Sequence, residues 1–578
     1  MKHTIIKDGK AFFHICTDLY AHETVRHAAS ELQKYIYRAT KTFIPYFSDK
    51  CNRRGAEIRI GGNVRKYPPL SLDDEEYCIY SSGEDICIDG GSPRGVLYGV
   101  YAFLEKFLGF RCYTKDVEHI DSCDTLEIEL DRISEKPAFE YREAYFRNAF
   151  DGGFCSKNRL NSNMGEMSNA QGGRVKWYNF HHSFNDLVNE ADWFDTHPEY
   201  FSEIDGKRVR NSQLCLSNPE VFELAKKRLI EWIKDNPEMS VFSVAQNDNE
   251  RRCTCEKCLA VEKEEGSPAG PVIRFVNALS DAVTKDYPHV MLHTFAYQYT
   301  LPAPKHAVAR DNVIVRICNI RSRHDKPLTE LAKLHPESDD GIFIKAIDDW
   351  KHHAKRLYVW DYATNFRHYL QPMFLLDTMA ENVKHYRDNG IMGVLQQGNF
   401  SYGGGAAMDD LKSYIIARLL WNPDCDIEKE KHGFMTAVYG EKAGAILEEY
   451  YNTMESACKS NVLKIYQPPQ AEYMTDELLE YCDGLFKKAE SVAENEEFLQ
   501  RVKREHLSIR FVMLARKPLG SEGRDDEVKE FFDDIKNFGI TEISERVPLE
   551  YSERCMYNSQ YDLTFDRENY YSLYYMMR

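Results

Sequence analysis

The chain of 578 residues lacks several features that would narrow its function at once. Its 16 Cys are too sparse for a disulfide scaffold of the kind that small secreted domains use. It has no run of about 18 apolar residues that could span a bilayer. Lys and Arg number 74 against 92 Asp and Glu, so the net charge of −18 argues against nucleic acid and anionic membranes as partners.

The N-terminus also lacks the apolar segment and the small-residue cleavage site of a secretory signal. Most cysteines lie singly in apolar runs such as Tyr77-Cys78-Ile79, where reduced and buried thiols are expected. We therefore expect a cytoplasmic protein, although a secreted chain whose signal has been removed would look the same.

Familiar catalytic signatures are missing as well. The chain has no G-x-G-x-x-G or P-loop spacing, no nucleophile elbow and no H-E-x-x-H segment. It does have many aromatic residues, with 36 Tyr and 31 Phe beside only 6 Trp. Aromatic rings provide the platforms on which sugars stack, although most of them belong to the core of any protein.

The first 130 residues alternate strand and helix patterns. Apolar residues at helical spacing predict a helix over 22–36, and a strand over 55–62 follows it. Two short strands, 76–80 and 85–89, form a predicted hairpin, and a helix over 96–107 stops at Gly109. The pattern predicts a small α/β domain over residues 1–130.

Residues 137–425 show strands separated by long helical connections. Several of these strands end in polar or aromatic residues, which suits parallel strands that deliver side chains to one catalytic rim. The pattern favours a (β/α)8 TIM-like barrel, although fewer than eight strands are clear. The strands that we predict lie near residues 141–146, 241–245, 290–297, 313–318, 356–360 and 393–396.

Residues 426–578 form a helical C-terminal region by the same reasoning, with apolar periodicity over 427–439, 441–460, 475–494 and 497–514. The predicted fold class is therefore α/β, with a small α/β domain, a barrel and a helical region in that order. A homo-oligomer is compatible with this organisation.

The most informative segment runs from Val241 to Cys258. Its apolar strand ends in Gln246-Asn247-Asp248-Asn249-Glu250, which places carboxylates at the strand end from which barrel enzymes act. Cleavage of a glycosidic bond needs a proton donor and a second group that stabilises or captures the cation at the anomeric carbon. Asp248 with Glu250, or Asp248 with Asp361, is the candidate catalytic pair. The alternative is that Asp248 caps the next helix or pairs with a neighbouring arginine.

Three cysteines follow at close spacing, Cys253, Cys255 and Cys258, and Cys215 supplies a fourth thiol. Zinc held by four thiolates is closed and structural, so the metal would pin the loop behind Asp248 and would not be the catalyst. Free thiols or a disulfide are the alternatives. We expect no cofactor for catalysis.

Aromatic and polar residues at other strand ends predict a sugar-binding pocket, because aromatic faces beside amides and carboxylates match the two faces of a pyranose. The predicted substrate-binding residues are His182, Asn247, Tyr297, Trp360, Asn365, Gln397, Tyr402 and Trp177.

Several stretches resemble a known family, the bacterial proteins with domain of unknown function 4838, some of which are classified as glycoside hydrolase family 163. The resemblance covers about residues 10–450. The N-terminal segment Gly91-Ser92-Pro93-Arg94-Gly95 is similar to the α/β domain that precedes the barrel in α-glucuronidases and β-hexosaminidases. The stretches that carry the family resemblance are Trp193 to Phe201, Gln213 to Val221, Asn247-Asp248 with the following cysteines, Val359 to Tyr362, and Tyr414 to Trp421.

This resemblance implies a (β/α)8 barrel glycosidase with endo-β-N-acetylglucosaminidase activity on N-glycans, which retains configuration with help from the substrate's own acetamide. Asp248 matches the motif carboxylate. At the end of the last strand the family pattern implies a Glu, but this chain reads Gln396-Gln397. An amide cannot donate a proton as a carboxylic acid does. Glu250 or Asp361 then supplies the acid, or the specificity differs, or the chain is inactive.

The sequence thus leads to two hypotheses. The first is a glycoside hydrolase that cleaves an oligosaccharide containing N-acetylhexosamine or uronate. The second is a catalytically silent carbohydrate-binding protein on the same barrel, which Gln396-Gln397 motivates.

Overall fold

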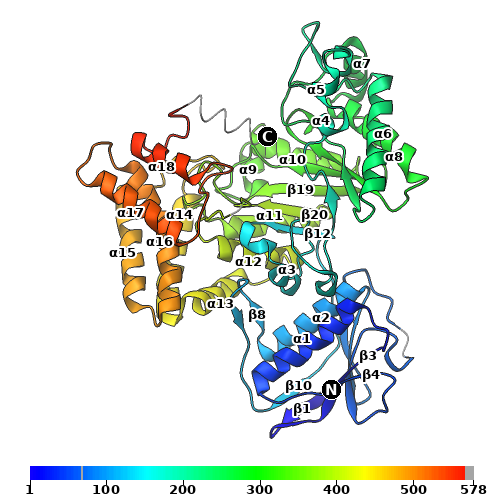
Figure 1. Ribbon diagram of the computed structural model, residues 1–578, viewed down its shortest axis with the longest axis vertical. Helices are drawn as coiled ribbons and strands as arrows, with labels where there is room; N and C mark the ends of the chain where they lie inside the picture. The colour runs from blue at the N-terminus through cyan, green and yellow to red at the C-terminus, as the bar shows by residue number, and fades with distance from the viewer. Residues whose placement is uncertain (67–68, 402, 567–578) are drawn as a thin grey trace.

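The computed structural model describes residues 1–66, 69–401 and 403–566. Figure 1 shows an N-terminal unit in blue, a central sheet with its surrounding helices in cyan to yellow, and C-terminal helices in orange and red. Among the described helices, none is both long and apolar enough to cross a membrane.

The N-terminal unit has a six-stranded sheet in the order β11-β6-β7-β5-β3-β4. Helices α1 (Glu23–Thr40) and α2 (Pro93–Leu108) pack side by side next to it (Figure 1). The predicted strand is β5 (Ala56–Ile60) and the predicted hairpin is formed by β6 and β7, so the sequence-based elements are confirmed. Gly109 ends α2 in the left-handed conformation, which glycine adopts without steric cost. The remaining strands of this sheet are β3 (Phe13–Thr17), β4 (Tyr46–Ser48), β6 (Tyr77–Ser82), β7 (Asp85–Gly90) and β11 (Ile133–Glu135).

The central sheet has seven parallel strands in the order β12-β20-β19-β18-β17-β16-β13. All six predicted strands are present, and the two-residue strand β13 was too short to give a sequence pattern. The parallel strand arrangement is therefore confirmed, but the described residues form a curled sheet of seven strands and not the predicted closed (β/α)8 barrel. These strands are β12 (Tyr141–Tyr145), β13 (Trp177–Tyr178), β16 (Val241–Ser243), β17 (Met291–Ala296), β18 (Val313–Cys318), β19 (Arg356–Tyr362) and β20 (Gly393–Gln397).

Two asparagine side chains connect the edges of this sheet, β12 and β13. Asn161 Oδ1 accepts a hydrogen bond from Arg142 N on β12 at 2.9 Å, and its main-chain oxygen accepts one from Val175 N at 3.0 Å. Asn163 Oδ1 accepts one from Trp177 N on β13 at 3.0 Å. Side-chain amides therefore take the place of a strand ladder here, and they satisfy backbone groups that would otherwise be buried without partners.

The C-terminal region contains α13 (Ile427–Tyr439), α14 (Glu441–Lys459), α15 (Asp476–Val492) and α16 (Glu496–Arg516), as the periodicity predicts, followed by α17 (Arg524–Asn537) and α18 (Leu549–Asn558). Its connecting segments bond to loops of the central sheet. Tyr369 N donates to Ile543 O at 2.7 Å, and Phe366 N donates to Ile465 O at 2.7 Å. The helical region thereby reaches the carboxyl edge of the sheet.

We predict that Asn161→Ala lowers the free energy of unfolding by about 1–3 kcal/mol, because it leaves the buried Arg142 N–H without its acceptor. Urea unfolding would measure the change. Exposed Asn52 is the matched control, and its replacement by Ala should change stability by less than about 0.5 kcal/mol. Equal effects of the two substitutions would contradict the bridging role of Asn161.

Candidate active site

A cleft of about 1490 Å³ opens at the carboxyl ends of the parallel strands. It exceeds the roughly 300–1,000 Å³ of pockets for small molecules. Its lining includes the aromatic residues Tyr145, Phe295, Trp360 and Phe400, and the rings of Tyr145 and Phe400 stack with centroids 5.0 Å apart. The cleft thus combines the volume for an extended ligand with the aromatic faces that sugars prefer.

Asp248 lines this cleft just beyond the end of β16, and 31% of its side chain is exposed. Tyr297 Oη donates a hydrogen bond to Asp248 Oδ1 at 3.2 Å. Burial raises the pKa of Tyr297, so the phenol stays protonated and remains a donor. Asp248 is therefore a solvent-accessible carboxylate with a fixed hydroxyl partner.

His182, in the segment that follows β13, lies next to the same carboxylate. Its Nδ1 lies 2.5 Å from Gln246 O, and because a carbonyl oxygen only accepts, Nδ1 carries the proton. Its Nε2 then faces Asp248 Oδ1 at 3.8 Å. His182, Tyr297 and Asp248 come from three neighbouring strand ends, as the sequence predicts for a site at one rim.

The predicted residues Asn247, Trp360 and Gln397 also line the cleft. Asn247 uses its side chain to hold loops, since Oδ1 accepts from Asn185 N at 3.0 Å and Nδ2 donates to Ser212 O at 2.7 Å. Trp360 Nε1 donates to Gln397 Oε1 at 2.7 Å. This bond fixes an indole and an amide in the floor of the cleft.

Asp361 does not reach the cleft, which corrects its prediction as a catalytic carboxylate. Its side chain is buried with both oxygens bonded: Oδ1 accepts from Asn319 Nδ2 at 3.0 Å and from Tyr362 N at 2.9 Å. Oδ2 accepts from Tyr386 Oη at 2.9 Å and from Gln396 Nε2 at 3.3 Å. Side chains alternate along a strand, so Trp360 faces the cleft while Asp361 packs on the other side of the sheet.

The structure does not place Glu250, the other predicted catalytic carboxylate, in the lining of the cleft. Glu250 forms an ion pair with Arg321, and both side chains are 57% exposed. The chain turns at Asp248 itself, where Asn249 N donates a hydrogen bond to Asn247 O at 2.7 Å. Two residues of separation therefore do not bring both carboxylates to one substrate.

Trp177 and Asn365, which the sequence analysis predicts to bind substrate, do not line the cleft. Trp177 is 5% exposed within the sheet interior, where the guanidinium of Arg316 lies 4.2 Å from its ring centroid. Asn365 is buried and bonded to backbone, with Nδ2 donating to Gln467 O at 2.8 Å. Tyr402 lies outside the described residues.

Several lining residues were missed by the sequence analysis, because they come from segments without a strand pattern. His181 precedes His182, and Asp186 and Glu190 lie on the short helices α4 (Phe184–Leu187) and α5 (Glu190–Trp193). The C-terminal region contributes further residues to the wall, namely Tyr466, Ser544, Glu545, Arg546, Val547 and Leu563.

His181 has an unusual electrostatic environment. The His181 side chain is exposed to solvent, and the partial desolvation by the protein around it, together with the neighbouring His182, lowers its pKa. The positive charges of Arg546 and Arg316 act in the same direction. His181 is therefore neutral at pH 7.

We predict that His181 makes stability depend on pH. Its pKa is lower in the folded chain than the value of about 6.5 when unfolded, so just below pH 6.5 the unfolded state binds more protons. The free energy of unfolding should fall as the pH falls below 6.5, and His181→Gln should make this slope shallower by a fraction of one proton, because solvent at the exposed ring weakens the effect. Urea unfolding at a series of pH values would measure it, and an unchanged slope would contradict the shifted pKa.

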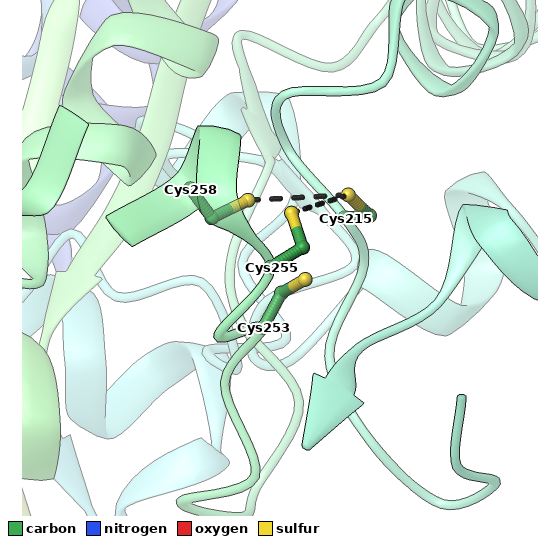
Figure 2. A group of neighbouring side chains, drawn as sticks. All are labelled: Cys215, Cys253, Cys255 and Cys258. Carbon is green, nitrogen blue, oxygen red and sulfur yellow. Dashed lines mark hydrogen bonds between the residues drawn. The ribbon is translucent and has the colours of Figure 1, made fainter. Parts of the chain in front are cut away.

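The four predicted cysteines lie together beside the cleft loops (Figure 2). All are buried, and their sulfur atoms lie within 4.8 Å of one another. Cys215 Sγ lies 3.7 Å from Cys255 Sγ and 3.9 Å from Cys258 Sγ. A disulfide has an S–S length near 2.05 Å, so the four are free thiols. The four cysteines that the sequence analysis grouped are therefore neighbours in the structure.

We compared the chain with solved structures, curated proteins and protein-family models. A solved structure of a glycoside hydrolase family 138 enzyme targeting pectin rhamnogalacturonan II is similar with a TM-score of 0.52 at 10% identity, over 97% of this chain and 78% of that one. A β-N-acetylhexosaminidase from Bacteroides fragilis gives 0.40 at 10% identity, over 74% and 89%. A chitobiase from Flavobacterium johnsoniae gives 0.43 at 12% identity, over 93% and 97%. No curated protein matches this chain in sequence.

The likeness to the family 138 enzyme shows that this chain has a fold found among glycoside hydrolases. A family model, described as domain of unknown function (DUF4838), matches residues 112–452, which include the whole central sheet and every cysteine of the cluster. The chain belongs to the DUF4838 family.

Proposed function

We propose that the chain is a glycoside hydrolase that cleaves an oligosaccharide containing N-acetylhexosamine. The observation that carries this proposal is the carboxylate of Asp248, which stands at a parallel strand end, bonded to Tyr297, in a large cleft with aromatic walls. Enzymes on parallel α/β sheets act from the carboxyl ends of their strands.

In this proposal the protonated form of Asp248 gives its proton to the leaving oxygen, and the carboxylate that results takes a proton from the attacking water. Glycosidases with two catalytic carboxylates place them about 5–9.5 Å apart across the bond. Asp361 is buried and bonded on the other side of the sheet, and Glu250 is paired with Arg321 and does not line the cleft, so neither is assigned as that second group. We therefore assign the nucleophile to the acetamide oxygen of the substrate, which attacks the anomeric carbon and forms a cyclic intermediate that water opens.

The hydrogen bond from Tyr297 holds Asp248 in place during these transfers. The hydroxyl of Tyr297 lies 3.2 Å from Oδ1 and His182 Nε2 lies 3.8 Å from the same oxygen. A carboxylate that is already fixed loses less entropy when it meets the glycosidic oxygen. This saving of entropy lowers the barrier of the reaction.

The charges of the cleft favour a neutral or amino sugar over a polyanion. Four carboxylates line it, Asp186, Glu190, Asp248 and Glu545, against two guanidinium groups. Arg546 lies 5.8 Å from the Phe400 ring centroid and is the group to which a uronate carboxylate would bind. The volume of the cleft supports an oligosaccharide, not a single sugar.

A catalytically silent carbohydrate-binding protein is the second candidate. The observation that favours it is Gln397 at the end of β20, whose amide accepts from Trp360 and is part of the cleft floor. Such a protein would bind the same oligosaccharides without turnover.

We predict that Asp248→Asn lowers kcat about 10²–10⁴-fold with little change in KM, because the amide removes acid and base catalysis but keeps the shape of the site. Hydrolysis of aryl β-N-acetylhexosaminides and of labelled N-glycan oligosaccharides would measure it. Glu250→Gln is the matched control and should keep wild-type activity.

Full activity of Asp248→Asn would contradict the assignment of this carboxylate. Binding of oligosaccharides by wild type, without hydrolysis of any of them, would select the silent carbohydrate-binding protein.

A further inference from the structure

We propose that Cys215, Cys253, Cys255 and Cys258 bind one structural zinc ion and that Gln213 transmits this constraint to the loop that carries Asp248. Gln213 is a positioning residue in this proposal. The metal site stands on its own geometry, and only the expected effect on catalysis rests on the proposed function.

The cluster fits zinc in number, distance and environment. Zn–S bonds of about 2.3 Å in a tetrahedron place the sulfur atoms about 3.8 Å apart, and the Cys215 sulfur lies 3.7 and 3.9 Å from two others. Glu203 N donates to Cys253 Sγ at 3.3 Å, and Arg208 Nη1 lies 3.7 Å from the same sulfur. Such N–H donors stabilise thiolates around a metal.

Four thiolates leave no open coordination position, so this site is structural. Cys215 comes from one segment, and the other three cysteines come from the start of α7 (Glu256–Glu265) and the residues before it (Figure 2). Hydrogen bonds already join the two segments beside the cluster, among them one from Cys258 Sγ to Ser217 Oγ at 3.2 Å. A metal would fasten the segments to each other.

Gln213 lies two residues before Cys215 and holds the catalytic loop. Its side chain is 2% exposed, and Oε1 accepts from Asn247 N at 2.8 Å. Nε2 donates to Asn247 O and to Asn249 O, both at 2.8 Å. One amide thereby binds the backbone on both sides of Asp248.

The cysteine cluster and Gln213 both constrain the short loop that carries Asp248. Asp248 lies between the residues that Gln213 binds, and Cys253 follows five positions later along the chain. Gln213 N also donates to Arg251 O at 3.3 Å, and Thr254 N donates to Glu203 O at 2.7 Å. Fixing Cys215 against the other cysteines therefore fixes Gln213 against the loop, and with it the position of the Asp248 carboxylate.

Elemental analysis of the purified full chain tests the metal directly. We expect about one zinc per chain, and Cys258→Ser should reduce this to well below half. Cys482→Ser, at a buried cysteine in α15, is the matched control and should keep the metal. Absence of zinc from wild type after expression in zinc-supplemented medium would overturn the metal site.

Gln213→Leu tests the positioning role. We expect it to keep zinc, to lower kcat about 10–100-fold and to change KM less than threefold, as for residues that orient a catalytic group. Hydrogen exchange supplies a readout besides activity, because the Asn247 N–H should exchange faster in Gln213→Leu and in Cys258→Ser. Gln33→Leu removes a glutamine bond to Ile44 O in the N-terminal unit and should change none of these values.

Two results would overturn the positioning role: wild-type kcat in Gln213→Leu, or unchanged exchange at Asn247 in both variants. The two proposals fail in different ways. If Asp248→Asn keeps full activity while zinc and exchange behave as expected, the proposed function fails and the metal anchor stands. If Asp248→Asn is inactive while Gln213→Leu is fully active, only the positioning role fails.

Discussion

The site depends on one constraint, the common direction of the seven strands in the central sheet. Because all seven are parallel, their carboxyl ends meet at one edge, and residues more than a hundred positions apart come together there. His182, Asp248 and Tyr297 follow three such ends and converge on one carboxylate oxygen. The aromatic walls and the C-terminal loops complete the cleft around that edge.

Amide side chains recur wherever the backbone leaves the regular sheet. Asn161 and Asn163 join the edge strands, Asn247 joins two cleft loops, and Gln213 holds both sides of Asp248. Each amide offers a donor and an acceptor in one plane, so it can take the place of a neighbouring strand. This lets irregular loops lie buried near the cleft without leaving backbone groups unpaired.

The sequence predicted what depends on periodicity and spacing. Apolar patterns located six of the seven strands and four C-terminal helices, α13 to α16, but not α17 and α18, and the close spacing of three cysteines led to the whole cluster. It failed for Asp361, because neighbouring residues of a strand face opposite sides of the sheet and Trp360 takes the cleft side, and Glu250 is paired with Arg321 outside the cleft lining. Nothing local marked Arg546 or Glu545 as cleft residues, since their place depends on how distant helices pack.

The central claim is that Asp248 acts together with the acetamide of the substrate. The most direct test compares kcat/KM for aryl N-acetylhexosaminides whose acetyl group carries zero to three fluorine atoms, which weaken the carbonyl oxygen as a nucleophile without altering the leaving group. The account predicts a fall of at least about tenfold from acetyl to trifluoroacetyl, because the weakened oxygen forms the bond in the rate-limiting step. Equal kcat/KM values across the series would contradict it.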